Sequence, residues 1–222
     1  MKIVNLILSV ILIICIPVAS ICVAYNLSAR LPDLYQYQFK SSEVIGALSL
    51  EMDENQLGEF FSQYMTGESD KFQIEYQFGE NTDKLFTGDE QETMLKFREK
   101  ADIVFLAGGI ALGLALLSYF LIYKQNLKML LRKSFNKALV LYVLLAATIF
   151  ILTFVEPVIK MEYARLFPYA MKDFLVLPQL LPLKFFVYNA WATVALSLII
   201  MLFSWYFTWK ITKPRRIFGS SR

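Results

Sequence analysis

The stretch Thr87–Lys124, TGDEQETMLKFREKADIVFLAGGIALGLALLSYFLIYK, passes from polar to apolar sequence with no proline between the two parts. Thr87 and Glu90 have the spacing of a capping box, which predicts that a helix starts here. Three apolar side chains then share one helical face: Met94, Phe97 and Ala101. The run Ile103–Tyr123 that follows is long enough to cross about 30 Å of hydrocarbon. The stretch predicts one unbroken helix that couples a segment outside the membrane to a membrane span.

Three further apolar runs have the length of a span: Ile3–Ala24, Ala138–Val155 and Val187–Trp209. The 222 residues are 57% hydrophobic and 18% charged, with a mean hydropathy of +0.49, which is typical of a membrane protein. We predict a mostly α membrane fold with four transmembrane helices and a small α+β external module between the first and second.

Basic residues are unevenly distributed, and short loops rich in Lys and Arg stay in the cytoplasm. Lys2, the loop 124–137 and the tail 210–222 supply eleven basic and no acidic residues, whereas 26–102 holds sixteen acidic and seven basic residues. We therefore predict a cell-membrane protein with both termini in the cytoplasm. The predicted segments are span 1–25, external module 26–101, span 102–123, basic cytoplasmic loop 124–137, span 138–156, apolar external loop 157–186, span 187–209 and basic tail 210–222.

A cleaved signal peptide is the alternative interpretation of residues 1–25, because a basic residue before an apolar run also opens secretory signals. The apolar run is nearly twice as long as a usual signal core. Ile21 also precedes Cys22, where a lipoprotein-type cleavage requires a small residue. These features favour an uncleaved anchor.

The first half of the external segment predicts an irregular stretch and then a helix. Asn26–Gln38 is polar around Pro32, and its aromatic residues are typical of interfacial anchors: Tyr35, Tyr37 and, just beyond, Phe39. Asp53 and Gln56 have capping-box spacing. Apolar residues at helical spacing follow until Gly67 ends the helix: Leu57, Phe60, Phe61 and Tyr64.

The second half of this segment predicts a hairpin. Apolar residues alternate with polar ones, the period of a half-buried strand, at Phe72, Ile74, Tyr76 and Phe78. Gly79–Asp83 is expected to turn the chain toward a short strand at Leu85 and Phe86.

The external loop 157–186 is strongly apolar, yet four prolines divide it into pieces too short to span: Pro157, Pro168, Pro178 and Pro182. So much apolar surface is not stable in water. We expect this loop to form a lipid-contacting collar in the outer interface.

Small residues recur along the second span: Ala107, Gly109, Ala111, Gly113 and Ala115. Such a surface lets another helix approach closely. Packing within the bundle is the favoured interpretation, and contact with another membrane protein through Gly109 and Gly113 is the alternative.

Several chemistries are excluded by composition. The sequence has no histidine, and its two cysteines, Cys15 and Cys22, both lie in the first apolar run. We therefore expect no disulfide framework, metal site or cofactor. The basic loop KQNLKMLLRK is explained by topology and anionic lipid, so no nucleic-acid partner is predicted.

Two stretches resemble the lipoprotein intramolecular transacylase (Lit) family of bacterial membrane proteins. They are FTGDEQETMLKFREKADIVF, which begins at Phe86, and YARLFPYAMKDFLVLPQLLPLKFF, from Tyr163 to Phe186. The resemblance implies four helices with a long first external loop, and transfer of an acyl chain from a lipoprotein's glycerol to its N-terminal cysteine amine by histidines in these stretches. Here Lys96 and Ala164 occupy the histidine positions, so the resemblance implies a divergent member without the family's catalytic pattern.

Charged residues at the outer interface are the candidates for any remaining catalysis: Lys96, Glu99, Asp102 and Arg165. A carboxylate would serve as base, and Lys or Arg would stabilise developing negative charge. The alternative is an ordinary ring of ion pairs with neighbouring charges, which we favour. The predicted lipid-binding residues are Phe97, Tyr163, Phe167, Phe174, Leu177 and Phe185.

Three functional hypotheses follow. The favoured one is a Lit-like membrane protein that binds or regulates lipid or lipoprotein at the outer interface without histidine catalysis. The second is an active lipoprotein or phospholipid acyltransferase. The third is a structural subunit of a cell-envelope complex.

Overall fold

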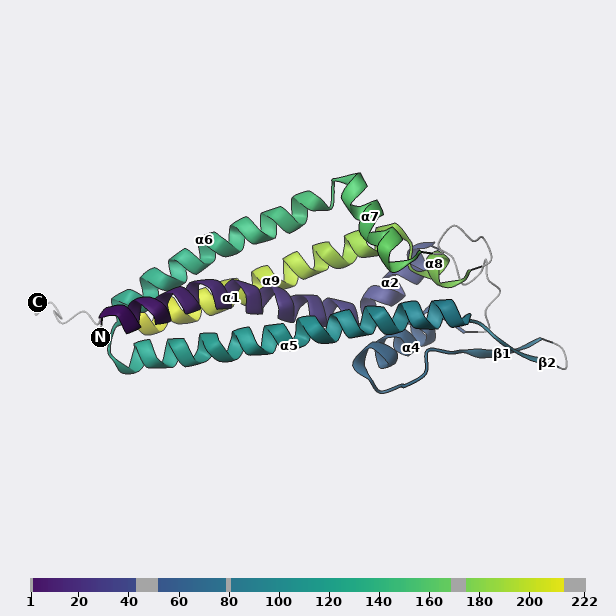
Figure 1. Ribbon diagram of the computed structural model, residues 1–222, viewed down its shortest axis with the longest axis horizontal. Coiled ribbons are helices and arrows are strands. Elements are labelled where there is room, and N and C mark those ends of the chain that lie inside the picture. The colour runs from purple at the N-terminus through teal and green to yellow at the C-terminus, as the bar shows by residue number, and fades with distance from the viewer. Residues whose placement is uncertain (1, 43–51, 79–80, 169–174, 214–222) are drawn as a thin grey trace, which may run out of the picture.

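The computed structural model describes residues 2–42, 52–78, 81–168 and 175–213. Within these ranges, four helices are long and apolar enough to cross a membrane: α1 (Lys2–Arg30), α5 (Gly88–Lys124), α6 (Lys128–Leu152) and α9 (Leu183–Thr212) (Figure 1). The chain is thus a multi-pass membrane protein. The start of α1 and the end of α9 lie at the same end of the bundle, which we call the terminal end.

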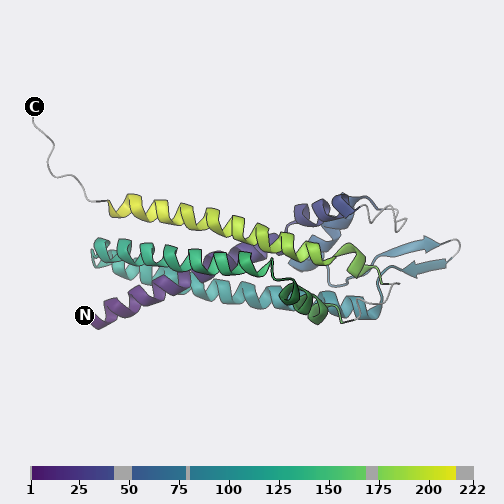
Figure 2. The same cartoon turned by 90° about the horizontal axis from the view of Figure 1, so that it is seen from above.

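α1 is the central helix of the bundle. It runs obliquely and packs against α5, α6 and α9 (Figure 2). Hydroxyl pairs join the spans: the Oγ atoms of Ser9 and Ser134 are 2.6 Å apart, and the Tyr142 hydroxyl is 2.9 Å from Ser197 Oγ. Large apolar side chains such as Leu106 and Leu144 are more than half exposed on the outside of the bundle, as expected for helices surrounded by lipid.

The remaining elements gather at the opposite end, and we call them the cap (Figures 1 and 2). They are α2 (Pro32–Ser42), α4 (Glu54–Thr66), β1 (Glu75–Phe78), β2 (Asn81–Lys84), α7 (Glu156–Leu166) and α8 (Leu177–Leu180). The cap helices, the first turns of α5 and the segments that flank the hairpin contribute to an aromatic core that includes Tyr35, Phe39, Phe61, Phe72 and Phe86. The ring centres of Phe72 and Phe86 are 4.4 Å apart.

Both predicted capping boxes are confirmed. Asp53 accepts a hydrogen bond from the Gln56 amide at 2.7 Å, and α4 ends at Gly67, whose φ of +87° favours glycine. Thr87 and Glu90 cap α5 reciprocally. α5 then continues without a break from the cap to the terminal end, as the sequence predicted.

The expectation of an irregular chain around Pro32 is wrong. α1 continues to Arg30, and α2 starts at Pro32. Proline at a first helical position costs no hydrogen bond, so it begins a helix here instead of interrupting one. Tyr35 and Phe39 are fully buried in the cap core and cannot anchor the interface, whereas Tyr37 is exposed.

The first strand is shorter than expected, and the second lies earlier in the sequence. β1 pairs with β2 antiparallel, with Glu75 opposite Lys84. The second strand thus occupies part of the predicted turn, and Phe86, expected in a strand, packs into the cap core instead. Burial of that ring against Phe72 decides its conformation.

The small residues of α5 divide between two faces. Ala111 and Ala115 are buried, and a Cβ added at Gly108 would lie 2.7 Å from the Cys22 Cβ on α1. Gly109 and Gly113 are exposed, and a Cβ at either would meet nothing within 4 Å. Close packing within the bundle therefore uses Gly108 and the two alanines.

Candidate functional site

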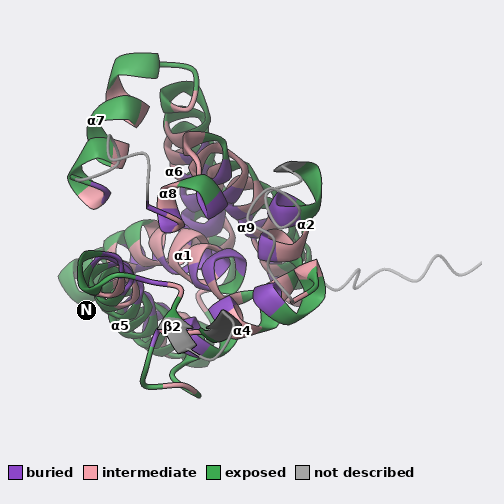
Figure 3. Ribbon diagram, turned by 90° about the vertical axis from the view of Figure 1, so that its right-hand side faces the viewer, coloured by how far each residue is buried: buried purple, intermediate pink, exposed green. Residues whose placement is uncertain are grey.

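α5 and α6 are connected by a short loop at the terminal end and diverge toward the cap (Figure 1). α7 lies across the wide end of this wedge, and none of its residues is buried (Figure 3). Beneath it is a cavity of about 350 Å³ bounded by α1, α5, α6, α7 and α9. An adjoining cavity of about 260 Å³ extends between α6, α7 and α9. We call the two cavities together the lateral groove.

The walls of the lateral groove are mainly apolar. The apolar residues common to both cavities are Ile149, Leu166, Phe186 and Ala190, and α1 and α5 add Ile21, Tyr25, Phe97 and Val104. Aromatic rings lie close together on the side of the groove nearest the cap. The ring centre of Phe186 lies 6.0 Å from that of Phe97 and 5.8 Å from that of Tyr163. The groove therefore suits an apolar ligand.

Two charged side chains line the groove, Lys100 from α5 and Glu162 from α7. Both residues are exposed, which places them at its mouth. Glu162 also forms an ion pair with Arg165, at 3.7 Å between Oε1 and Nη1. The mouth thus offers an ammonium group and a carboxylate to the polar end of a ligand.

The floor of the groove carries buried polar groups. Asn189 and Thr193 of α9 line it, each 4% exposed. Ser28 of α1 donates a hydrogen bond to Asn189 Oδ1 at 2.6 Å, and its Oγ is 2.9 Å from the Thr193 hydroxyl. These contacts fix the amide of Asn189 at the groove wall.

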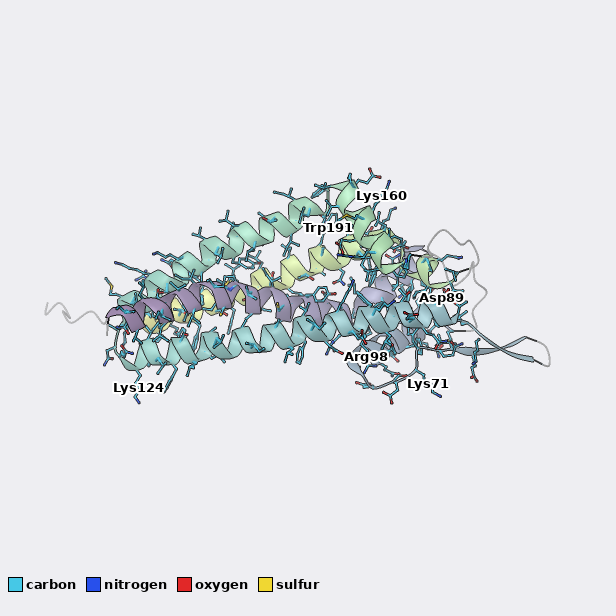
Figure 4. The ribbon with its side chains drawn as sticks, in the orientation of Figure 1. Lys71, Asp89, Arg98, Lys124, Lys160 and Trp191 are labelled. Carbon is cyan, nitrogen blue, oxygen red and sulfur yellow. The ribbon has the colours of Figure 1, made fainter. Side chains whose placement is uncertain are left out.

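The outer end of the groove is held by contacts between α6 and α9. The Trp191 indole donates to Thr153 Oγ1 at 3.0 Å, and its ring packs against Phe150 and Phe154. Figure 4 shows Trp191 beneath α7, while Lys160 of α7 lies on the outer side, where it pairs with Glu156 at 2.6 Å. The hydrogen bond from Lys160 lowers the pKa of Glu156.

A buried carboxylate, that of Glu90, connects the start of α5 to the start of α8. Glu90 is 3% exposed, and its Oε2 accepts hydrogen bonds from the amide and hydroxyl of Thr87 at 2.8 and 2.9 Å. Its Oε1 accepts the Leu177 amide at 2.6 Å. One side chain thus caps α5 and holds the start of α8.

The sequence-predicted catalytic residues do not converge on the groove. Lys96 pairs with Glu92 at 2.7 Å and lowers its pKa, and Asp102 pairs with Arg30 at 2.5 Å. Glu99 is exposed, and Arg165 reaches the groove only through Glu162. Their catalytic roles remain predictions.

The five predicted lipid-binding residues that the structure describes occupy two kinds of position. Phe97 and Tyr163 line the groove, and Tyr163 is buried enough to raise its pKa. Phe167, Leu177 and Phe185 belong to the cap core, the last two with no exposed surface, so lipid would reach them only if that core opened. Phe174 lies outside the described residues.

Lys100, Glu162 and Asn189 are groove residues that sequence reasoning did not select. The two charges were indistinguishable from other members of an interfacial ring. Asn189 had a usable signal, because a polar side chain within an apolar span points to function by default.

A search of solved structures finds a match over nearly the whole chain. It is the in meso structure of the membrane integral lipoprotein intramolecular transacylase Lit from Bacillus cereus, with a TM-score of 0.62, covering 95% of this chain and 98% of that one. The chain has the Lit fold. At 11% identity, the match shows the fold alone. No protein-family model matches the sequence, and a search of the curated proteins finds no match.

Proposed function

We propose that this Lit-like membrane protein binds the acyl chain of a lipid or lipoprotein in the lateral groove and does not use histidine catalysis. The observation that carries the proposal is an apolar cavity between two diverging spans, with Lys100 and Glu162 at its mouth. Its two parts, about 350 and 260 Å³, fall near or within the size range of small-molecule sites, roughly 300–1,000 Å³.

The chemistry of the groove supports an amphiphile over a wholly apolar ligand. Each buried methylene of an acyl chain contributes about 0.8 kcal/mol. Lys100 provides a positive charge for a phosphate or carbonyl group, and Asn189 provides a fixed amide deeper in the groove. α7 has no fully buried residue, and its contacts with the cap core are made by Tyr163 and Leu166.

The orientation belongs to the same proposal. The basic terminal end faces the cytoplasm, and the cap, with its α+β module of 26–101, lies outside. The groove then opens at the outer leaflet, where a bacterial lipoprotein carries its acyl chains.

Photolabelling tests this function. The purified chain in bilayers is exposed to a phospholipid, or to a diacylated lipopeptide, with a photoreactive group near the end of one acyl chain. Labelled peptides are mapped by mass spectrometry. We expect enriched labelling of groove residues from separate helices, among them Phe97, Leu166 and Phe186.

A matched pair of variants controls for general lipid contact. Ala190→Phe fills the groove, because Ala190 lines both cavities, and is expected to reduce this labelling at least fivefold. Ala107→Phe adds the same ring at an exposed site on α5 and should leave labelling unchanged. Equal labelling over all lipid-facing surfaces, unaffected by Ala190→Phe, contradicts the proposal.

Acyl transfer is a second candidate, favoured by the presence of both a carboxylate and an ammonium group in the groove lining. Glu162 would take a proton from the attacking amine and return it to the glycerol oxygen as the amide bond forms and the ester bond breaks, and Lys100 would stabilise the oxyanion. Expression in a lipoprotein-producing host without native Lit decides between the two. No conversion of diacyl lipoprotein to the N-acylated lyso form is expected; conversion that Glu162→Gln abolishes would establish an enzyme instead.

The envelope-subunit hypothesis has one supporting observation, the exposed Gly109 and Gly113 on α5. Purification in mild detergent tests it. A stoichiometric partner lost with Gly109→Leu would support this hypothesis, whereas a chain that elutes alone would oppose it.

A further inference from the structure

A second cavity lies between α1, α5 and α9 and shares no lining residue with the lateral groove. α1 packs against both α5 and α9, whereas the backbones of α5 and α9 rarely approach each other closely. The space left between them has a volume of about 330 Å³. We call it the terminal crevice, and the residues that define it are Ala19, Ser20, Ala115, Tyr119, Phe207 and Thr208.

The shape of the terminal crevice follows from its small floor residues and large rim residues. Ala19 and Ala115 are each 4% exposed and leave the hollow, whereas Phe207 is 52% exposed on its edge. The crevice lies between spans, so lipid is the surrounding medium. Its apolar walls suit one acyl chain, and the hydroxyl-bearing Tyr119 and Thr208 mark the end nearer the membrane surface.

Lysines follow that end of the crevice along both helices. Lys124 follows Tyr119 by five residues along α5, or roughly 8 Å, and Lys210 follows Thr208 by two residues along α9, or roughly 3 Å. Lys124 extends away from the bundle at the terminal end (Figure 4). The segments 1–25, 103–155 and 187–222 contain no Asp or Glu. No carboxylate in these segments therefore competes with a lipid phosphate for these lysines.

We propose that the terminal crevice binds an anionic glycerophospholipid, with one acyl chain between α5 and α9 and the phosphate beside Lys124 and Lys210. Charge complementarity selects this occupant over a zwitterionic lipid, whose own ammonium group would meet the same cations. The site is distinct from the lateral groove, because the two share no lining residue. The crevice is lined by 112–119 of α5 and 203–208 of α9, whereas the groove is lined by 97–104 and 186–193 of the same helices.

Quenching of a local tryptophan tests the proposal in bilayers. The three native tryptophans are replaced by phenylalanine, and Phe207→Trp places one reporter on the crevice rim. Brominated phosphatidylglycerol in phosphatidylcholine is compared with brominated phosphatidylcholine in phosphatidylglycerol. The two quenching curves give the preference, which is the affinity of phosphatidylglycerol at this reporter divided by that of phosphatidylcholine. We expect a preference of about fivefold for each lysine that contacts the phosphate.

Two controls separate the crevice from general attraction to a basic surface. Leu202→Trp places the reporter on the same helix but outside the crevice lining, where we expect a preference near one. Lys124→Gln with Lys210→Gln should bring the preference at Phe207→Trp to the same value. Equal preferences at the two reporters, or a preference that survives loss of both lysines, would overturn the proposal.

A second measurement uses the chain with its native tryptophans. Native mass spectrometry from detergent should show phosphatidylglycerol retained at higher collision energy than phosphatidylcholine with the same acyl chains. Ala115→Leu, which fills the crevice, should remove that difference, whereas Gly113→Leu, in open space on α5, should preserve it. Equal retention of the two lipids by the unmodified chain overturns the proposal without any variant.

Discussion

The cap and the terminal half of the bundle bury their apolar residues in opposite ways. In the cap, Phe61 and Phe72 are almost fully buried, as in a water-soluble protein. In the spans, Phe120 is 59% exposed, and only about a quarter of each apolar window is buried. The spans are held together by small residues and hydroxyl pairs, such as Ser9 with Ser134. The same residue type therefore has a structural role in one half and faces lipid in the other.

The largest expected effect comes from removing a ring of the cap core. Phe61→Ala should destabilise the protein by about 3–5 kcal/mol, because the ring is fully buried among Tyr35, Phe39 and Phe72. Thermal unfolding in detergent measures it. Phe120→Ala is the matched control and should change stability by less than about 0.5 kcal/mol. Similar losses for the two variants would contradict the comparison.

The sequence was sufficient wherever a local rule decides the structure. The capping boxes at Asp53 and Thr87 depend on a residue three positions away, and both formed. The four spans also follow from apolar runs long enough to cross a membrane. Such features are set by neighbours along the chain, so they can be predicted without knowing the fold.

Features that depend on distant packing could not be predicted. An aromatic cluster at a membrane surface and one in a small buried core have the same composition, so Tyr35 and Phe39 were assigned to the interface. Likewise, Lys100 and Glu162 line one groove only because α7 folds back between α5 and α6. No periodicity in either segment indicates this contact.

The connection between α5 and α8 gives the next largest effect. Glu90→Ala should cost about 2–3 kcal/mol, because it removes a charged acceptor and leaves the buried Leu177 amide unpaired. Amide hydrogen exchange should accelerate at 175–181, beside the groove. Glu92→Ala removes an exposed carboxylate on the same helix and should leave exchange there unchanged. If the amides of 175–181 exchange at the same rate in Glu90→Ala, the buried contact does not hold α8 in place.

The two faces of α5 allow a smaller test within the spans. Gly108→Leu should destabilise the bundle by about 1–3 kcal/mol, because a side chain there collides with Cys22 of α1. Gly109→Leu, one residue away in open space, should leave the melting temperature within a degree or two. Loss of stability in Gly109→Leu instead would mean that this face packs against another protein in the membrane.

The smallest effect is expected at the boundary of the two regions, where Arg30 at the end of α1 pairs with Asp102 of α5. Asp102 is 56% exposed, so solvent screens the pair, and a double-mutant cycle with Arg30→Gln and Asp102→Asn should give a coupling of about 1 kcal/mol or less. Arg30 also lies over the Phe105 ring at 5.2 Å, an interaction that Asp102→Asn leaves intact. Arg30→Gln should therefore cost more than Asp102→Asn. Equal costs would mean that the ion pair, and not the ring contact, accounts for the role of Arg30 between the span and the cap.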